Sequence, residues 1–179
     1  MLSMSIIDIL DFLNLVVVIK LFFMGKYDRE EAVQYAKTWA YSRNPKYYNF
    51  DSVGGDCTSF VSQCIYAGAK VMNYSQYGWY YKNGNNKSAS WSGVEYLYKF
   101  LVNNKTVGPY GREVALSELE KGDLIQLSFD GTTFGHTLII TDIRNGSIYI
   151  ASHTEDSYDR DVMSYGFRRL RGIKIEGVR

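Results

Sequence analysis

The sequence predicts an α+β fold, with helices in the first half of the chain and an antiparallel sheet in the second. Apolar residues recur at helical spacing up to Leu101, whereas short strand-like runs separated by glycine turns follow from Leu124 onward. The 179 residues contain no internal repeat or low-complexity linker, which favours one main domain, residues 25–179. Lysine plus arginine number 20 and aspartate plus glutamate 19, so the net charge of +1 gives no indication of a nucleic-acid partner.

Three helices are expected in the first half of the chain. The capping box Asp28-Arg29-Glu30-Glu31 predicts the start of the first helix. The second is expected to begin at Cys57 and to end near Gly68. A second capping box at residues 92–95 predicts the start of the third. The segment 73–90 is rich in Asn, Gly, Ser and Tyr without a clear period, so we expect a long surface loop there.

The second half of the chain contains four strand-like segments. They are residues 124–127, 137–143, 147–153 and 172–178. Asn145-Gly146 between the second and third segments is a strong signal for a two-residue hairpin turn. The two segments around this turn are therefore expected to pair as antiparallel strands.

Cys57 is the most informative residue of the chain. It follows Gly54-Gly55-Asp56 in the first turn of the second helix, and a helix N-terminus favours thiolate over thiol. Cys64 lies two helical turns later among apolar residues, so we expect it in the core. Two turns of helix rise by about 10.5 Å, too far for a disulfide between the two cysteines. Cys57 is therefore the candidate nucleophile.

The two histidines are the candidate partners of this thiol. His136 begins one strand of the expected hairpin and His153 ends the other, so antiparallel pairing brings both to the same end of the sheet. We expect His136 to act as general base and His153 to orient it by a hydrogen bond. Asp156, three residues after His153, is the alternative orienting residue.

An aromatic segment between the helices is a candidate substrate-binding surface. Trp79, Tyr80 and Trp91 are the residues that we expect to form the wall of a groove, because aromatic rings suit sugars and peptides. The alternative is that the two tryptophans fix the loop to the core.

The apolar segment 1–24 precedes the expected domain. Asp8, Asp11 and Lys20 interrupt it, and it lacks a basic start and a small-residue cleavage site, unlike a signal peptide. A spanning helix needs about 20 apolar residues with few charges. We expect translation to start at Met24, with a membrane-associated helix as the alternative. The location therefore stays open between the cytoplasm and release to the cell wall.

The ordered motifs of the chain resemble the putative amidase domain family, a branch of the papain-like cysteine hydrolases related to the NlpC/P60 and CHAP cell-wall hydrolases. The resemblance covers roughly residues 27–179 and begins with Gly-Gly-Asp-Cys-Thr-Ser-Phe-Val-Ser-Gln at 54–63. It continues in order through residues 78–81, Ser90-Trp91, 122–126, 135–137 and 153–156. Ser59 departs from the family pattern, in which we expect Asn.

This resemblance implies a papain-like fold without a cofactor, and hydrolysis of an amide bond through a thioester acyl-enzyme. Cys57 would be the nucleophile, His136 the base and His153 the third member of the triad. The backbone N–H of Cys57 would serve in the oxyanion hole, and Asp56 would cap the helix or brace the loop. The implied substrate is peptidoglycan, cut within its stem peptides or at the bond joining them to the sugar.

Other functions use the same residues. The triad could also perform deamidation, transpeptidation or cleavage of a protein substrate, as an effector or toxin would. Outside enzymes, the alternative is a non-catalytic cell-wall binding module. Cys57, His136 and His153 have the ligand types of a zinc site, but the paired spacing of such sites is missing, so no metal is predicted.

Overall fold

The computed structural model describes residues 25–179. The expectations for the apolar segment 1–24 lie outside the described residues. The helices are α2 (Arg29–Trp39), α3 (Cys57–Ala69), α4 (Ala89–Ser92) and α5 (Val94–Asn103). The strands are β1 (Tyr81–Asn83), β2 (Asn86–Lys87), β3 (Pro109–Val114), β4 (Leu124–Ser128), β5 (His136–Arg144), β6 (Ser147–Ser152), β7 (Ser157–Asp161) and β8 (Arg169–Val178). No helix within this described range is long and apolar enough to cross a membrane.

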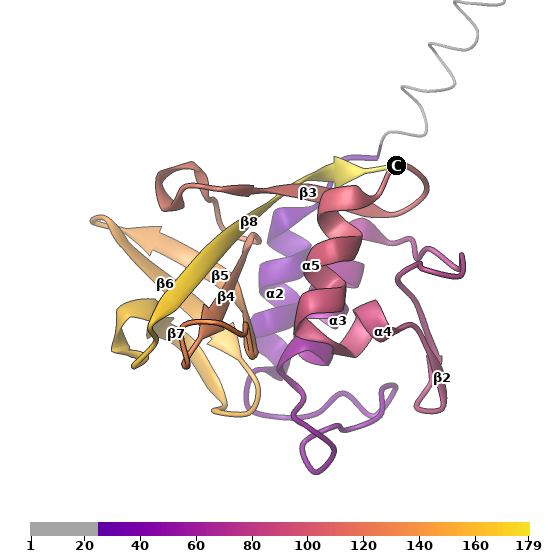
Figure 1. The fold of residues 1–179 in the computed structure, drawn as a ribbon, viewed down its shortest axis with the longest axis horizontal. Helices are drawn as coiled ribbons and strands as arrows, with labels where there is room; N and C mark the ends of the chain where they lie inside the picture. Colours follow the sequence, from indigo (N-terminus) through magenta and orange to yellow (C-terminus); the bar gives the residue numbers. More distant parts are fainter. Residues whose placement is uncertain (1–24) are drawn as a thin grey trace, which may run out of the picture.

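A six-stranded antiparallel sheet forms the second half of the fold. Its strand order is β3-β8-β4-β5-β6-β7. The helices α2, α3 and α5 gather beside this strongly twisted sheet (Figure 1), with α3 packed against β5 and β6 and α5 against β3. The expected α+β class, with helices first and an antiparallel sheet afterwards, is confirmed.

The two faces of the sheet support separate apolar clusters. Ile139 and Ala151 face the helices and join the cluster that contains Phe60 of α3. Ile140 and Ile150, their neighbours along β5 and β6, belong to a second cluster on the other face. This division follows from the alternation of side chains along a strand. It determines which side chains of the sheet can approach α3.

Local signals account for several element boundaries. The Asp28 carboxylate accepts a hydrogen bond from the Glu31 N–H at 3.1 Å, which confirms the expected start of α2. Asn145 and Gly146 have φ of 52° and 83°, the left-handed conformations that a type I′ turn requires, and they join β5 to β6 as expected. Cys57 is the first residue of α3, also as expected.

Three segments differ from the expectations. Ser92 does not cap a helix, because it ends α4, and Gly93 is the N-cap of α5 instead. The expected loop at 73–90 contains the short β1–β2 hairpin and the start of α4. The sheet also has two strands, β3 and β7, that the sequence did not indicate. Both carry mostly polar or half-exposed residues, so no apolar alternation marks them.

Candidate active site

Cys57 lies where a tight turn enters α3. Gly54 and Gly55 have φ of 91° and 98°, a left-handed conformation that side chains rarely adopt. A Cβ on Gly55 would also lie 3.0 Å from the Thr154 hydroxyl, in the turn after β6. Glycine is therefore needed to bring the chain into the helix at this point, and Cys57 is held close to the sheet with only 7% of its surface exposed.

The thiol meets the start of β5. The backbone N–H of Thr137 and the side chain of Thr58 both hydrogen-bond the Cys57 sulfur, with Thr58 Oγ1 at 3.7 Å from Sγ. The Thr58 and Thr137 hydroxyls are themselves 2.9 Å apart. These contacts fasten the first turn of α3 to the strand residue that follows His136.

The pKa of the Cys57 thiol is raised, whereas its place at a helix start led us to expect a stabilised thiolate. Burial raises the pKa of the thiol, and the hydrogen bonds from Thr137 and Thr58 oppose this increase only in part. The neighbouring Asp56 carboxylate raises the pKa further. A helix N-terminus alone favours the thiolate, but here desolvation outweighs it. The resting thiol is therefore protonated.

His136 is the first residue of β5 and is nearly buried, with 6% of its surface exposed. Its ring lies between Phe129 and Tyr165, with centroids 6.3 and 5.8 Å away. Burial lowers the pKa of His136 to about 4; Glu155 opposes this shift and Arg160 adds to it. At neutral pH the imidazole is therefore uncharged and able to accept a proton.

His153 follows the last residue of β6 and is 1% exposed. Its Nδ1 lies 2.6 Å from Asp56 Oδ2, and its Nε2 lies 2.9 Å from the carbonyl oxygen of Trp39. The Phe60 ring stacks on the imidazole with centroids 3.9 Å apart. Both ring nitrogens of His153 are thus bonded to groups other than His136.

The two histidines reach the same end of the sheet, as expected, but on opposite faces. His136 shares a face with Ile140 and packs on Tyr165, which belongs to the cluster away from the helices. His153 contacts Phe60 of α3, in the cluster that faces the helices. The structure therefore brings Cys57 close to the start of β5, and His153 close to the residue that precedes Cys57.

Asp156, the alternative orienting residue, lies at the surface. Both of its carboxylate oxygens accept hydrogen bonds from Arg43, at 2.9 and 2.8 Å. Arg43 also binds Asp51 in a bidentate ion pair. No signal in the sequence singled out Arg43, because Asp51 lies eight residues on in the same irregular connection and Asp156 lies in the distant turn between β6 and β7.

The aromatic segment is mostly part of the core. Trp79 and Trp91 are 0% exposed, and the Trp79 indole N–H donates to Ser62 Oγ at 3.0 Å. A substrate therefore does not reach either indole. Both tryptophans instead fix the loop to the core, the alternative given by the sequence. Tyr80 is half-buried, and its ring packs at a tilt against that of the exposed Tyr74, with centroids 5.3 Å apart. Only the tyrosines of this segment are open to a ligand.

A buried polar chain lies behind the thiol. Gln126 Nε2 donates to the Thr137 hydroxyl at 3.3 Å, and Gln126 Oε1 accepts two hydrogen bonds from Arg171, at 2.9 and 2.6 Å. Arg171 is also paired with Glu95 at 2.7 Å. No motif in the sequence indicates this buried polar chain, because its members are dispersed over α5, β4, β5 and β8.

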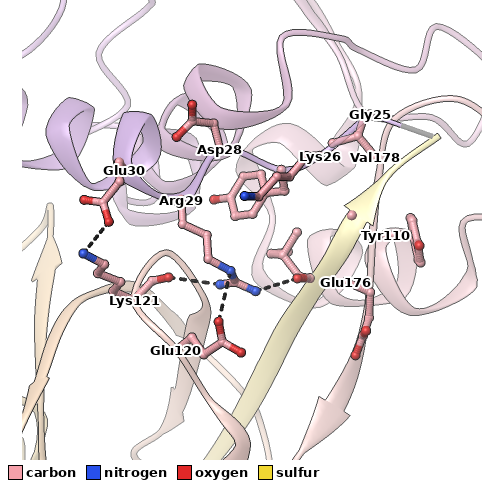
Figure 2. Close-up of a pocket in the computed structure, with 13 residues that line it drawn as sticks. Gly25, Lys26, Asp28, Arg29, Glu30, Tyr110, Glu120, Lys121, Glu176 and Val178 are labelled. Atoms are coloured by element: carbon pink, nitrogen blue, oxygen red, sulfur yellow. Dashed lines mark hydrogen bonds and ion pairs between the residues drawn. The ribbon is translucent and has the colours of Figure 1, made fainter. Parts of the chain in front are cut away.

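Two pockets of the surface lie apart from the candidate catalytic side chains. Figure 2 shows a pocket of about 670 Å³ beside the start of α2, where Arg29 bonds the carbonyl of Lys121. A second pocket, of about 730 Å³, lies along α5. Neither is lined by Cys57, His136 or His153. Within residues 25–179, no three His, Cys, Asp or Glu side chains are grouped so as to hold a metal ion.

Comparison with known proteins identifies the family of the chain. A protein of Bacillus subtilis (strain 168), described as "Uncharacterized protein YhbB", is 35% identical over 137 residues, which make up 74% of this chain and 43% of that protein. The chain thus spans less than half the length of this relative. No solved structure matches. A family model described as "Putative amidase domain" matches residues 26–174, so the chain belongs to the putative amidase domain family, a description that points to an enzyme hydrolysing amide bonds.

Proposed function

We propose that this protein is a cysteine amidase that cuts an amide bond of peptidoglycan through a thioester acyl-enzyme. The observation that carries the proposal is the contact between the Cys57 sulfur and the backbone N–H of Thr137. It joins a thiol at a helix N-terminus to the strand residue next to a neutral imidazole, that of His136. Acyl transfer requires a base within reach of the nucleophile, and we assign this role to the His136 ring at the start of β5.

The resting site holds its proton on sulfur. Burial raises the pKa of Cys57 and lowers that of His136, so both side chains are uncharged at neutral pH. His136 then takes the thiol proton as the sulfur attacks the substrate carbonyl carbon. The same imidazolium returns the proton to the leaving amine as the C–N bond breaks and the thioester remains. In the second half-reaction His136 deprotonates a water molecule, which releases the acid and restores the thiol.

The start of α3 supplies donors for the oxyanion. The Asp56 side chain makes no capping hydrogen bond to the helix, because its two oxygens bind the Phe50 N–H and His153. The first N–H groups of α3, including that of Cys57, therefore have no side-chain cap. Such fixed donors stabilise the negative oxygen of a tetrahedral intermediate.

The family description and the resemblance to cell-wall hydrolases support peptidoglycan as substrate. Its stem peptides and the amide that joins them to the sugar both offer the required bond. The exposed Tyr74 and Tyr77, the latter in the pocket along α5, offer flat apolar rings to a peptide or sugar. The reaction needs no metal or organic cofactor, since thiol and imidazole account for every proton transfer.

Digestion of purified peptidoglycan tests the proposal. We expect fragments from the wild type and from Cys64→Ala, the matched control at a fully buried cysteine, and none from Cys57→Ala. Mass spectrometry of the fragments identifies the bond that is cut. Fragments from folded Cys57→Ala would exclude the cysteine mechanism. Absence of fragments from all three folded proteins would exclude peptidoglycan and direct the search to protein substrates, with amine acceptors added to detect acyl transfer.

A further inference from the structure

We propose that His153 is a positioning residue for the nucleophile and not for the base: as an imidazolium it counters the charge of Asp56, so that this carboxylate opposes formation of the Cys57 thiolate less than it would alone. This inference rests on the proposed function only in taking Cys57 as the reactive thiol. It assigns a specific task to the residue that immediately precedes the nucleophile.

The pair formed by His153 and Asp56 is almost completely enclosed. The side chains of His153 and Asp56 are 1% and 2% exposed, and their closest atoms, Nδ1 and Oδ2, are 2.6 Å apart. The other oxygen of Asp56 accepts a hydrogen bond from the backbone N–H of Phe50 at 3.2 Å. A buried carboxylate with these partners has little water to screen its charge, and Cys57 is the next residue in the chain.

Both ring nitrogens of His153 face hydrogen-bond acceptors. Nε2 of His153 faces the carbonyl oxygen of Trp39 at 2.9 Å, and a carbonyl can only accept. Nδ1 faces the Asp56 carboxylate, which as an anion also only accepts. Both hydrogen bonds form together when both nitrogens carry a proton, which makes the ring a cation. The Phe60 ring stacked on it at 3.9 Å adds a favourable contact for a positive charge.

The charges around Asp56 do not balance without His153. Arg43 is the other cation near Asp56, with Nε 3.9 Å from Oδ2. Its guanidinium is already hydrogen-bonded to Asp51 and Asp156. Two cations thus face three carboxylates in this cluster. Without the His153 charge, the nearest cation to Asp56 would be Arg43, whose Nε is 3.9 Å from the carboxylate. The negative charge of Asp56 would then lie next to the thiol with little compensation.

The turn that carries His153 is also under strain. Thr154 has φ of 82°, a conformation that β-branched residues rarely adopt, and its hydroxyl lies against Gly55. Strain of this kind persists where surrounding contacts hold it. Here the contacts hold the turn after β6 against the loop that leads into Cys57.

The test is the pH dependence of Cys57 alkylation by iodoacetamide, read for this cysteine by peptide mass spectrometry. For His153→Gln we expect the midpoint to move upward by about one pH unit, which is about tenfold slower alkylation below the midpoint. In Asp56→Asn/His153→Gln the carboxylate is gone as well, and the midpoint should return to the wild-type value or below it. An unchanged midpoint in folded His153→Gln would overturn the proposal.

A measurement on the wild type covers the case in which His153→Gln does not fold. Nitrogen-15 NMR of histidine-labelled protein, with the His136 signals assigned by His136→Gln, should show both ring nitrogens of His153 protonated at neutral pH. A neutral His153 tautomer would overturn the proposal. Failure of the proposed function has a different signature: Cys57 would still show the predicted shifts on alkylation, while Cys57→Ala would leave peptidoglycan digestion unchanged.

Discussion

At the scale of single residues, burial decides the charge of both groups that we assign to the chemistry. The thiol of Cys57 and the imidazole of His136 are nearly enclosed, and each is held in its uncharged form. The sequence could place Cys57 at a helix start, because glycines and helical period are local signals. It could not give the pKa of the thiol, because desolvation depends on the strand and loops that cover the helix end.

The pH dependence of catalysis follows from the state of His136. We expect kcat/KM to rise with pH through about 4, since His136 must be neutral to take the thiol proton and burial lowers its pKa to about 4. Steady-state rates on a soluble amide substrate across the acid range measure this limb. An acid limb near 6.5, the ordinary histidine value, would contradict the assignment of His136 in its buried state as base.

The same buried imidazole makes the stability depend on pH. His136 titrates near 6.5 in the unfolded chain and at about 4 in the folded protein. The unfolded state therefore binds more protons between these values, and the free energy of unfolding falls as the pH drops through this window. Between about pH 7 and pH 4.5 the loss attributable to His136 is about 2.5 kcal/mol.

Urea denaturation of the wild type and of His136→Gln at these two pH values isolates this contribution. The glutamine variant does not titrate, so its stability should fall by about 2.5 kcal/mol less than that of the wild type. Equal losses in the two proteins would mean that His136 is not the buried titrating group.

At the scale of elements, one inserted residue explains why the two histidines lie on opposite faces of the sheet. Near the turn, Asp142 pairs with Tyr149, but beyond it Ile140 pairs with Ile150, so Thr141 is a β-bulge in β5. Without the bulge, His153 would pair opposite Leu138 and share a face with His136. A shift of one residue moves every later side chain to the other face. The hairpin was predictable from Asn145-Gly146, whereas nothing in the local sequence marks the bulge.

The end of α3 allows a stabilising substitution. Its C-cap, Lys70, has φ of 59°, a left-handed conformation that favours glycine. We expect Lys70→Gly to raise the free energy of unfolding by roughly 0.5–1 kcal/mol. The ion pair of Lys70 with Glu31 is exposed, so its loss has little effect. Lys70→Ala is the matched control: it loses the same ion pair without gaining conformational freedom and should not be stabilised in urea denaturation.

At the scale of the whole molecule, the sequence predicts the order of its two halves but not the full width of the sheet. Four strands carry apolar runs and were predicted. The edge strands β3 and β7 carry polar residues such as Arg112 and Asp159, because one side of each meets water. Strands of this kind acquire their structure from a neighbour, and pairing with β8 and β6 cannot be read from composition.

The two halves are joined by an ion pair between α2 and the start of β4. Arg29 lies 2.6 Å from the Asp123 carboxylate, which is fully buried, and also donates to the carbonyl of Ile175 in β8. Figure 2 shows this guanidinium reaching from the helix toward β8. Burial raises the pKa of Asp123, and hydrogen bonds from Arg29 and from the Ile175 and Glu120 N–H groups oppose that increase. Arg29 thus keeps a buried anion compatible with the folded state.

Removal of this cation should weaken the whole fold. We expect Arg29→Met to lower the free energy of unfolding by roughly 3–5 kcal/mol at neutral pH, because the Asp123 charge stays buried without its partner. Without Arg29 the folded pKa of Asp123 rises further above the unfolded value. The stability that Arg29→Met loses relative to the wild type is therefore largest above the pKa of Asp123 in the folded variant. This loss becomes smaller as the pH falls below that pKa. The control Arg29→Met/Asp123→Asn removes both charges, so its stability should be less dependent on pH in this range. A deficit in Arg29→Met that is equal at acidic and neutral pH would show that lost packing of the arginine, and not the buried charge, causes the change.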